Sequence, residues 1–335
     1  MSLVRASLAL LSATLLATAA SAATTVKLGT LVPVGTSYHK ALMALGETWK
    51  KDSGGEVNLR IYAGGKAGGE AEMVGLMMGN SLQASLLTAV GLGEIDRHAV
   101  GLQLIPMGFR TLEELDYVAE RVQPALEERL AQKGFVVLFW TDAGWIRFFS
   151  KSPVNRPADL QALKVFSWAG ESSQMEVAKM AGFRPVPIET ADIVPSLQTG
   201  LIEAVPMPPF FALASQVDVR APHMLELNWA PIVGACVVRK ETWDKIAPEV
   251  REKMMTAARK AGAEIKAAGR RESVESVAAM QKRGLKVTVP SPEVVDEWRQ
   301  VIEPMYPRLR GRSVPAEIFD QVTGLLQEYR SKQTP

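Results

Sequence analysis

Short β-rich runs alternate with amphipathic stretches along most of the chain. Apolar and β-branched residues clustered between turn residues predict strands, and apolar residues recurring every three or four positions predict helices. In the first half the pattern predicts strands at 26–32, 57–62, 84–87 and 135–140. It predicts helices from Thr36 or Ser37 to 51, from the glycines at 64–69 to 78, and at 112–132, with 88–93 as a loop. This order favours a mostly parallel sheet with helices on both faces.

The second half repeats this alternation without repeating the sequence. Strands are predicted at 164–168, 184–187 and 204–206, and helices at 172–180 and 193–199. The chain is therefore expected to form two α/β lobes. Residues 248–283 contain no helix breaker other than glycines 262 and 269, so they predict one helix of about 54 Å. Such a helix is longer than one lobe is wide and is expected to run across both. A last helical stretch, 292–330, is broken around 304–307.

The N-terminal segment predicts export. Arg5 is followed by an apolar stretch from Ala6 to Ala17 and by an Ala20-Ser21-Ala22 cleavage pattern, so residues 1–22 are interpreted as a signal peptide. The alternative, a buried core helix, fits poorly because small residues dominate the segment. The apolar stretch is also too short to span a bilayer, and no longer one follows, so we expect a periplasmic protein without direct membrane insertion.

Composition narrows the possible functions. The chain has 335 residues, a net charge of +2 and 47% hydrophobic residues, which favours a globular protein of two domains and gives no reason to expect nucleic acid binding. A single cysteine, Cys236, and three widely separated histidines exclude an internal disulfide and any local zinc motif. No nucleophile elbow is present, and the run AGGKAGGE lacks the ending of a phosphate loop. These observations favour ligand capture between two lobes over catalysis, without metal or cofactor.

The segment from Gly144 to Pro209 carries the most informative motifs. It reads GWIRFFSKSPVNRPADLQALKVF and later AGFRPVPIETADIVPSLQTGLIEAVPMPP. It resembles the solute receptors of tripartite ATP-independent periplasmic (TRAP) transporters of the DctP type. The resemblance implies a two-lobe, Venus-flytrap α/β receptor that closes around a small organic acid and delivers it to TRAP-type permease subunits. It also implies lobe I at 23–144 plus 233–271 and lobe II at 145–232 plus 272–335.

Three departures from the family pattern concern the ligand. The family's arginine that clamps a ligand carboxylate corresponds to Phe166 here, and a polar residue before a proline corresponds to Met207. Two residues separate Gly144 from Arg147, where the family has one. The usual dicarboxylate specificity is therefore in question. We expect a carboxylated ligand with an apolar or aromatic body.

The resemblance and the predicted loop positions together give a set of candidate ligand-binding residues: Arg147, Phe166, Trp168, Met207, Tyr38, His39, Glu70, Thr88, Phe210 and Trp229. Most of them have a structural alternative. Arg147 fits an interlobe salt bridge or an exposed charge as well as a ligand contact. The aromatic residues and Met207 fit ordinary core positions. His39 fits a helix cap, and Glu70 and Thr88 follow the glycine loop and the third strand, where cleft-facing loops of α/β folds lie.

Two other functions stay open. A receptor with the same cleft that presents its ligand to a sensor kinase has the same sequence pattern, and only neighbouring permease genes separate the two. An exported enzyme that acts in this cleft would need an activated nucleophile or a metal, and the sequence motifs supply neither.

Overall fold

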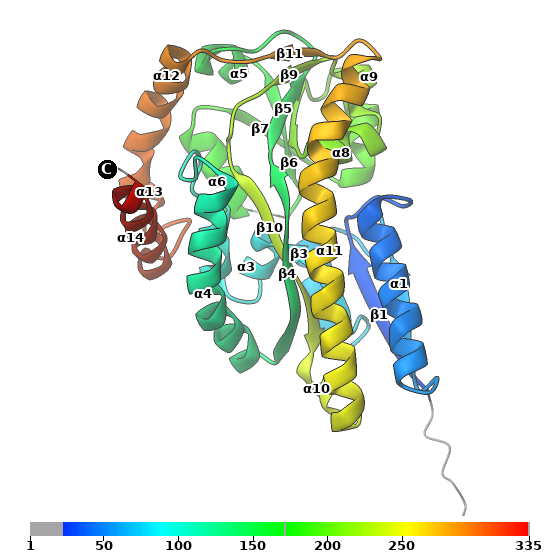
Figure 1. The fold of residues 1–335 in the computed structure, drawn as a ribbon. Coiled ribbons are helices and arrows are strands. Elements are labelled where there is room, and N and C mark those ends of the chain that lie inside the picture. The colour runs from blue at the N-terminus through cyan, green and yellow to red at the C-terminus, as the bar shows by residue number, and fades with distance from the viewer. Residues whose placement is uncertain (1–22, 171, 334–335) are drawn as a thin grey trace, which may run out of the picture.

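Two β-sheets form the centre of the protein. The computed structural model describes residues 23–170 and 172–333, so the predicted signal peptide lies outside the described residues (Figure 1). The first sheet defines the first lobe and has the strand order β2 (Val57–Tyr62), β1 (Thr24–Thr30), β3 (Ala84–Thr88), β10 (Pro231–Arg239) and β4 (Phe135–Trp145). The second sheet defines the second lobe and has the order β11 (Lys286–Thr288), β9 (His223–Leu225), β5 (Arg147–Ser150), β8 (Ala204–Met207), β6 (Lys164–Trp168) and β7 (Arg184–Ile188).

Helices cover both sheets. Those of the chain up to the end of β8 are α1 (Ser37–Asp52), α2 (Glu70–Met78), α3 (Ala89–Gly93), α4 (Leu112–Gln132), α5 (Pro157–Gln161), α6 (Ser172–Met180) and α7 (Ile193–Thr199). Those that follow are α8 (Pro209–Ala214), α9 (Val217–Arg220), α10 (Lys240–Asp244), α11 (Pro248–Gln281), α12 (Pro292–Ile302), α13 (Tyr306–Leu309) and α14 (Ala316–Gln333). Short 3₁₀ helices are η1 (Arg97–Leu102), η2 (Thr190–Asp192) and η3 (Glu303–Met305).

The two-lobe α/β prediction is confirmed, but both sheets are mixed and not mostly parallel. Strand β1 pairs in parallel with β2 and β3, whereas β10 is antiparallel to β3 and β4. In the second sheet, β5 is antiparallel to both of its neighbours. These strands are the ones by which the chain passes between lobes. Residue 146 joins β4 to β5, and β9 leads back to β10.

Most predicted elements match the structure closely, and two differ for local reasons. The predicted loop 88–93 contains α3, because the Thr88 hydroxyl accepts a hydrogen bond from the Gly91 backbone N–H at 3.4 Å and caps this short helix. The fourth strand extends to Trp145, five residues beyond the predicted end, since it pairs with β10 along nearly its whole length.

The long helix α11 contacts both lobes, as predicted (Figure 1). Its 34 residues span about 51 Å. It packs on α1 and β4 of the first lobe and on α8 of the second. Two glycines make the approach possible. A Cβ atom on Gly262 would lie 2.5 Å from Cβ of Phe139, and one on Gly269 would lie 2.2 Å from the Tyr38 hydroxyl oxygen.

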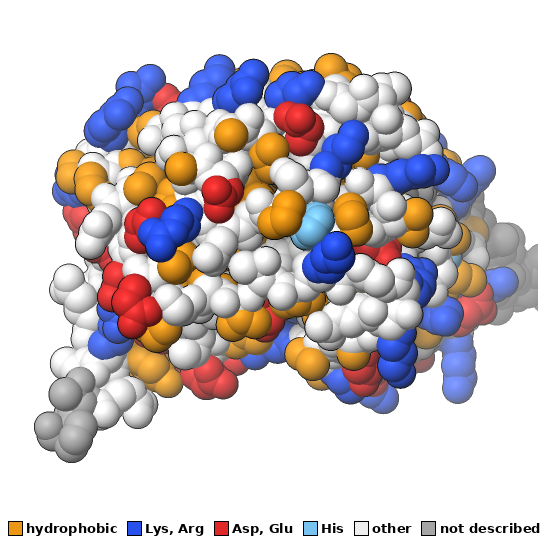
Figure 2. Space-filling view, turned by 90° about the horizontal axis from the view of Figure 1, so that it is seen from above, with side chains coloured by type: hydrophobic (Ala, Val, Ile, Leu, Met, Phe, Trp, Pro, Cys, Tyr) orange, Lys and Arg blue, Asp and Glu red, His pale blue; other side chains and the backbone are white. Residues whose placement is uncertain are grey.

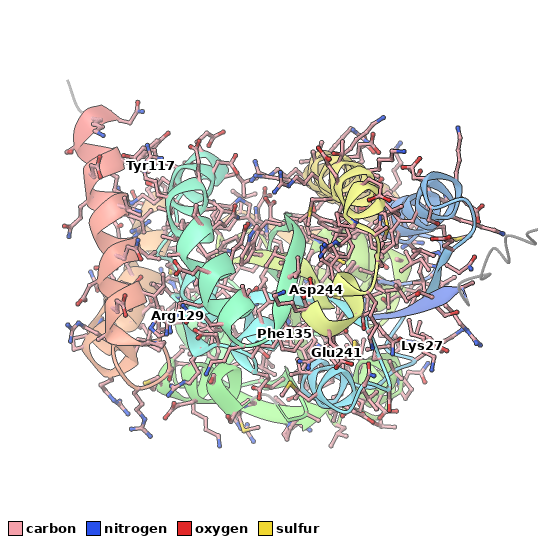
Figure 3. All side chains as sticks on the ribbon, turned by 90° about the horizontal axis from the view of Figure 1, so that it is seen from below. Lys27, Tyr117, Arg129, Phe135, Glu241 and Asp244 are labelled. Carbon is pink, nitrogen blue, oxygen red and sulfur yellow. The ribbon has the colours of Figure 1, made fainter. Side chains whose placement is uncertain are left out.

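The C-terminal helix α14 lies beside α4, at the outer side of the first lobe (Figure 3). The Tyr117 hydroxyl donates to Glu328 at 2.8 Å, and Arg330 pairs with Glu114 at 2.7 Å. The lobe boundaries given above stay a proposal, in which the last part of 272–335 packs on first-lobe helices.

The face of the molecule at the top of Figure 1 is shown in Figure 2. Hydrophobic side chains on this face are scattered among charged ones and form no continuous apolar surface. Large apolar side chains are instead buried in the cores, such as Phe149 in the second lobe and Trp49 in the first.

Candidate functional site

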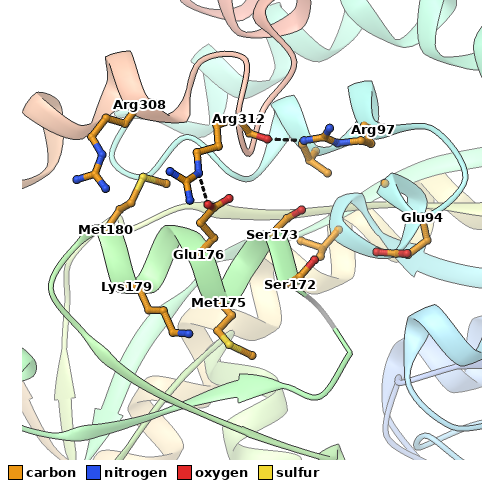
Figure 4. Close-up of a pocket in the computed structure, with 13 residues that line it drawn as sticks. Glu94, Arg97, Ser172, Ser173, Met175, Glu176, Lys179, Met180, Arg308 and Arg312 are labelled. Atoms are coloured by element: carbon orange, nitrogen blue, oxygen red, sulfur yellow. Dashed lines mark hydrogen bonds and ion pairs between the residues drawn. The ribbon is translucent and has the colours of Figure 1, made fainter.

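A large cavity lies between the lobes, and we call it the basic cavity (Figure 4). Its volume is about 870 Å³. The first lobe contributes α3 and η1, the second contributes α6, and the segment around α13 closes one side. Its charged lining residues are Glu94, Arg97, Glu176, Lys179, Arg308 and Arg312. Basic side chains therefore outnumber acidic ones.

Glu176 is already paired within this cavity. Its carboxylate accepts hydrogen bonds from Arg312 Nε and from the Ser313 hydroxyl, the latter at 2.7 Å, and these bonds lower the pKa of Glu176. Arg97 in turn donates to the backbone oxygen of Arg312. Among the residues that the structure describes, no acidic side chain forms an ion pair with Lys179 or Arg308. These two cations are therefore available to an anion.

A second, smaller cavity surrounds Glu70 and is called the Glu70 cavity. It has a volume of about 50 Å³ and is lined by the ends of β1, β3 and β4, by Tyr38 and Glu70, and by Phe211 of the second lobe. The predicted residues Glu70 and Thr88 bind each other here. The Glu70 carboxylate accepts from the Thr88 backbone N–H at 2.7 Å and from its hydroxyl at 2.6 Å. Burial raises the pKa of Glu70, and the bonds from Thr88 oppose this effect.

Tyr38 joins the two lobes at the same cavity. Its hydroxyl donates to the backbone oxygen of Asp142 at 2.6 Å, and its ring stacks on Phe210 of α8 with centroids 5.0 Å apart. Burial raises the pKa of this hydroxyl. His39, next in sequence, instead accepts a hydrogen bond at Nδ1 from the Gly35 backbone N–H at 3.3 Å. This contact closes the turn before α1, which corresponds to the capping alternative.

A third cavity, the Ser167 cavity, also measures about 50 Å³ and lies between residues 103–106 of the first lobe and β6 and α6 of the second. Trp229 lines it within an aromatic cluster, with ring centroids 5.3 Å from both Phe148 and Phe183. The Ser167 hydroxyl and the Gln174 side-chain oxygen are buried there without a hydrogen-bond partner.

Phe166 and Trp168 pack on each other and into the second-lobe core. Because side chains alternate along a strand, they share the face of β6 opposite to Ser167. Their ring centroids are 5.0 Å apart, and Trp168 Nε1 donates to the Thr190 hydroxyl at 3.0 Å. Met207 belongs to the same apolar cluster. Phe166 also borders the Ser167 cavity, so it belongs both to the second-lobe core and to the wall of this cavity.

Arg147 lies apart from these three cavities. It borders a fourth space, of about 300 Å³, beside α11 and Glu226. Its NH1 atom donates to the backbone oxygen of Leu227 at 2.8 Å and to the Asn228 side chain at 2.7 Å. Burial lowers the pKa of Arg147 to about 10, and Glu226 counteracts this, so the guanidinium stays charged at neutral pH. The structure therefore gives Arg147 an anchoring role for the segment before β10.

Some residues that line the cavities were not selected from the sequence. Ser167 stands between the candidates Phe166 and Trp168, and the alternation of side chains along a strand indicates that it lies on the opposite face of β6. Arg308 and Arg312 come from a distant segment that carries no motif, so only the tertiary structure places them beside α6.

Neither small cavity has a lysine or arginine among its lining residues. Within residues 23–170 and 172–333, no group of three or more metal-binding side chains is placed to hold an ion, and no helix is long and apolar enough to cross a membrane.

Comparison with known proteins places this architecture in a family. Residues 28–311 match the family model DctP, described as bacterial extracellular solute-binding protein, family 7. The sialic acid-binding periplasmic protein SiaP of Vibrio cholerae is 22% identical over 87% of this chain and 89% of its own length. The 2,3-diketo-L-gulonate-binding periplasmic protein YiaO of Escherichia coli is 25% identical over 68% of this chain and 69% of its own.

Solved structures share the fold. The sugar acid binding protein DctPAm of Advenella mimigardefordensis, in complex with galactonate, superposes with a TM-score of 0.83 at 16% identity and covers 92% of this chain and 99% of its own. A TRAP solute binding protein of Ralstonia eutropha with bound acetolactate gives 0.84 at 18% identity, over 91% and 99%. These matches confirm the resemblance that the sequence motifs indicated. The chain therefore belongs to family 7 of the bacterial extracellular solute-binding proteins, the DctP family, and is a solute receptor rather than an enzyme.

Proposed function

We propose that this receptor captures a small organic acid between its lobes and delivers it to the membrane subunits of a TRAP transporter. The basic cavity is the observation that carries the proposal. Its volume of about 870 Å³ lies in the range of small-molecule sites, and its walls come from both lobes. Lys179 and Arg308 give it positive charge that attracts an anion.

The relatives support an acidic solute. Curated relatives are named for sialic acid, 2,3-diketo-L-gulonate and C4-dicarboxylates, and solved neighbours contain galactonate and galacturonate. Each of these ligands carries a carboxylate. We extend this shared chemistry to the present chain. Phe166 and Met207, which replace polar residues of the family pattern but do not line the basic cavity, favour a solute body more apolar than that of a dicarboxylate.

We propose that residues 1–22 are a cleaved signal peptide and that the receptor works in the periplasm, where it would meet a TRAP permease. Mass spectrometry of the protein recovered from the periplasm is expected to show a chain that begins at or next to Ala23. A chain that retains Met1 would contradict this localisation.

The central experiment is a thermal shift and calorimetry screen with monocarboxylates, sugar acids and C4-dicarboxylates. A ligand at about 100 times its Kd stabilises the folded receptor by about 2.7 kcal/mol. We expect at least one acid to stabilise the protein, whereas its neutral amide does not. If no acid produces a shift, the proposed solute class is wrong.

The variant Lys179→Gln/Arg308→Gln tests the basic cavity with the acid found by that screen. Loss of two nearby cations is expected to slow association by about tenfold at low salt and to reduce its salt dependence. Arg310→Gln/Arg239→Gln removes the same net charge outside the cavity lining and serves as the control. Equal effects of both double variants would mean that overall charge, and not this cavity, attracts the acid.

A further inference from the structure

The C-terminal segment packs on the first lobe, although the helix before it packs on the second. In α12, Trp298 donates from Nε1 to the Asn155 backbone oxygen of the second lobe at 2.8 Å. In contrast, α14 packs on α4 and η1 of the first lobe, so closely that a Cβ atom on Gly101 would lie 2.5 Å from Cγ1 of Ile318. Residues 303–305 therefore form a further passage of the chain between the lobes, and the segment after them is attached to the first lobe.

One acidic side chain of the second lobe binds this C-terminal segment. The carboxylate of Glu176, on α6, accepts a hydrogen bond from Arg312 Nε with one oxygen and from the Ser313 hydroxyl with the other, the latter at 2.7 Å. Arg97 of η1 donates to the Arg312 backbone oxygen, and Figure 4 shows both contacts of Arg312 as dashed lines. We call Glu176, Arg312 and Ser313 the interlobe cluster, because the carboxylate and its two donors belong to different lobes.

The geometry of this cluster depends on the relative position of the lobes. Glu176 moves with α6, whereas Arg312 and Ser313 are held to the first lobe through Arg97 and α14. Both oxygens of the carboxylate are used, and hydrogen bonds to a charged group are stronger than neutral ones. Ser313 is 1% exposed, so its hydroxyl has little access to water in place of Glu176. Separation of the lobes therefore breaks these bonds at a cost in free energy.

We infer that the interlobe cluster is a latch, which forms when the lobes close and must break before they open. The latch slows the release of a bound solute and so sets how long the receptor retains it. This inference goes beyond the proposed function, because it concerns the rate of opening and not the identity of the solute. A matched ion pair lies within one lobe, where Arg310 donates from Nε and NH2 to the two carboxylate oxygens of Asp320 at 2.7 and 2.6 Å.

The first test needs no solute. In Glu176→Cys/Arg312→Cys, a short bismaleimide is expected to link the two lobes and to reduce the radius of gyration in small-angle X-ray scattering, because linked lobes cannot separate. Arg310→Cys/Asp320→Cys joins two residues of one lobe and should be linked without a change in the curve. Cys236 is buried and does not compete for the reagent. Failure to link the lobes, or a linked protein with an unchanged curve, would show that closure does not form the cluster and would overturn the inference.

The second test measures stopped-flow kinetics with succinate, galactonate and phenylacetate as probes. Glu176→Gln and Arg312→Gln both break the cluster, so each is expected to raise the dissociation rate of a bound probe by about three- to tenfold. Their effects on association should differ in sign, because one variant removes a negative charge from the basic cavity and the other a positive charge. The double variant should dissociate no faster than the faster single variant, since both remove the same interaction. Arg310→Gln, the control, should keep the wild-type dissociation rate.

The outcomes separate the latch from the proposed function. Dissociation rates that change in opposite directions in the two single variants would mean that cavity charge, and not a latch, controls release. That result, or wild-type dissociation rates in both variants, overturns the inference and leaves the proposed function standing. If none of these probes nor any acid of the wider screen binds, the proposed function fails, and the cross-linking result alone decides whether the latch exists.

Discussion

Glu70 is a carboxyl group enclosed by protein and hydrogen-bonded by Thr88. It is 2% exposed, and Thr88 supplies hydrogen bonds to both of its oxygens. Burial disfavours the charged form, which is why the pKa is raised. A residue of this kind links the stability of the fold to pH.

The expected pH dependence follows from the direction of that shift. An acid whose folded pKa is raised contributes its stability below the unfolded value, near 4.5, and loses it as the pH rises through the folded pKa. Glu70→Gln should therefore gain stability relative to the wild type between pH 5 and pH 8, by about 1.4 kcal/mol for each unit of pKa shift. Urea unfolding of both proteins across this range measures it. A difference that does not change with pH would show that Glu70 keeps an ordinary pKa.

Arg147 is the second residue whose role can be decided by stability. Its bonds to Leu227 and Asn228 predict that Arg147→Ala lowers the free energy of unfolding by about 1.5–3 kcal/mol, as expected for hydrogen bonds to a charged group. Chemical denaturation measures this, with Arg184→Ala, an exposed arginine of the same lobe, as control. Unchanged stability together with a large loss of solute affinity would instead support the ligand contact that the sequence motif suggested.

At the scale of elements, α11 determines how closely its neighbours approach. Glycine normally weakens a helix by about 1 kcal/mol relative to alanine. At position 262 the missing Cβ is required, because it would lie within 2.5 Å of Phe139 on β4. Gly262 therefore serves the close packing of α11 on the sheet and not the stability of the helix itself.

Two alanine substitutions separate these effects. Gly262→Ala is expected to destabilise the protein by about 1–3 kcal/mol, since overpacking at the sheet outweighs the gain in helix propensity. Gly324→Ala, in α14, meets no atom within 4 Å and should stabilise by about 0.5–1 kcal/mol. Melting temperatures of both variants provide the measurement. A stabilising Gly262→Ala would mean that α11 can shift away from β4 at little cost.

Elements were easier to predict from the sequence than the site. Strands such as 57–62 and helices such as 112–132 match their predicted bounds, because hydrophobic periodicity is a local signal. The antiparallel insertion of β10 between β3 and β4 has no local signal. The site residues were hard to predict for the same reason, because local patterns carry no information on tertiary contacts. Phe166 was predicted to lie in a strand, as it does, but the pattern did not indicate whether its side chain faces the core or the cleft.

At the scale of the whole molecule, the lobes are in contact. The Cβ position of Gly69 on the first lobe lies 3.5 Å from the Glu189 carboxylate of the second, and that of Gly170 lies 3.8 Å from Cβ of Ala71. Apart from the basic cavity, the Glu70 and Ser167 cavities between the lobes measure only about 50 Å³ each. The arrangement corresponds to a closed receptor.

A closed receptor must open to admit its solute. Since a ligand favours the state to which it binds more tightly, we expect the unliganded protein in solution to be more extended than this structure and to contract on binding. Small-angle X-ray scattering with and without a saturating acid from the screen measures the radius of gyration. Identical curves would argue against hinge closure.

The antiparallel strand β10 also bears on how this protein comes to be folded. It fills the place between β3 and β4, yet 85 residues separate it from the end of β4 in the chain. Until residues 231–239 have been synthesised, the first sheet is therefore incomplete, and the edges of β3 and β4 that pair with β10 have no partner strand. Contacts between segments so distant in sequence form slowly. For a chain that is proposed to leave the cytoplasm, this delay is useful, because a polypeptide that has not yet closed its first lobe remains extended enough to be threaded through a narrow membrane channel.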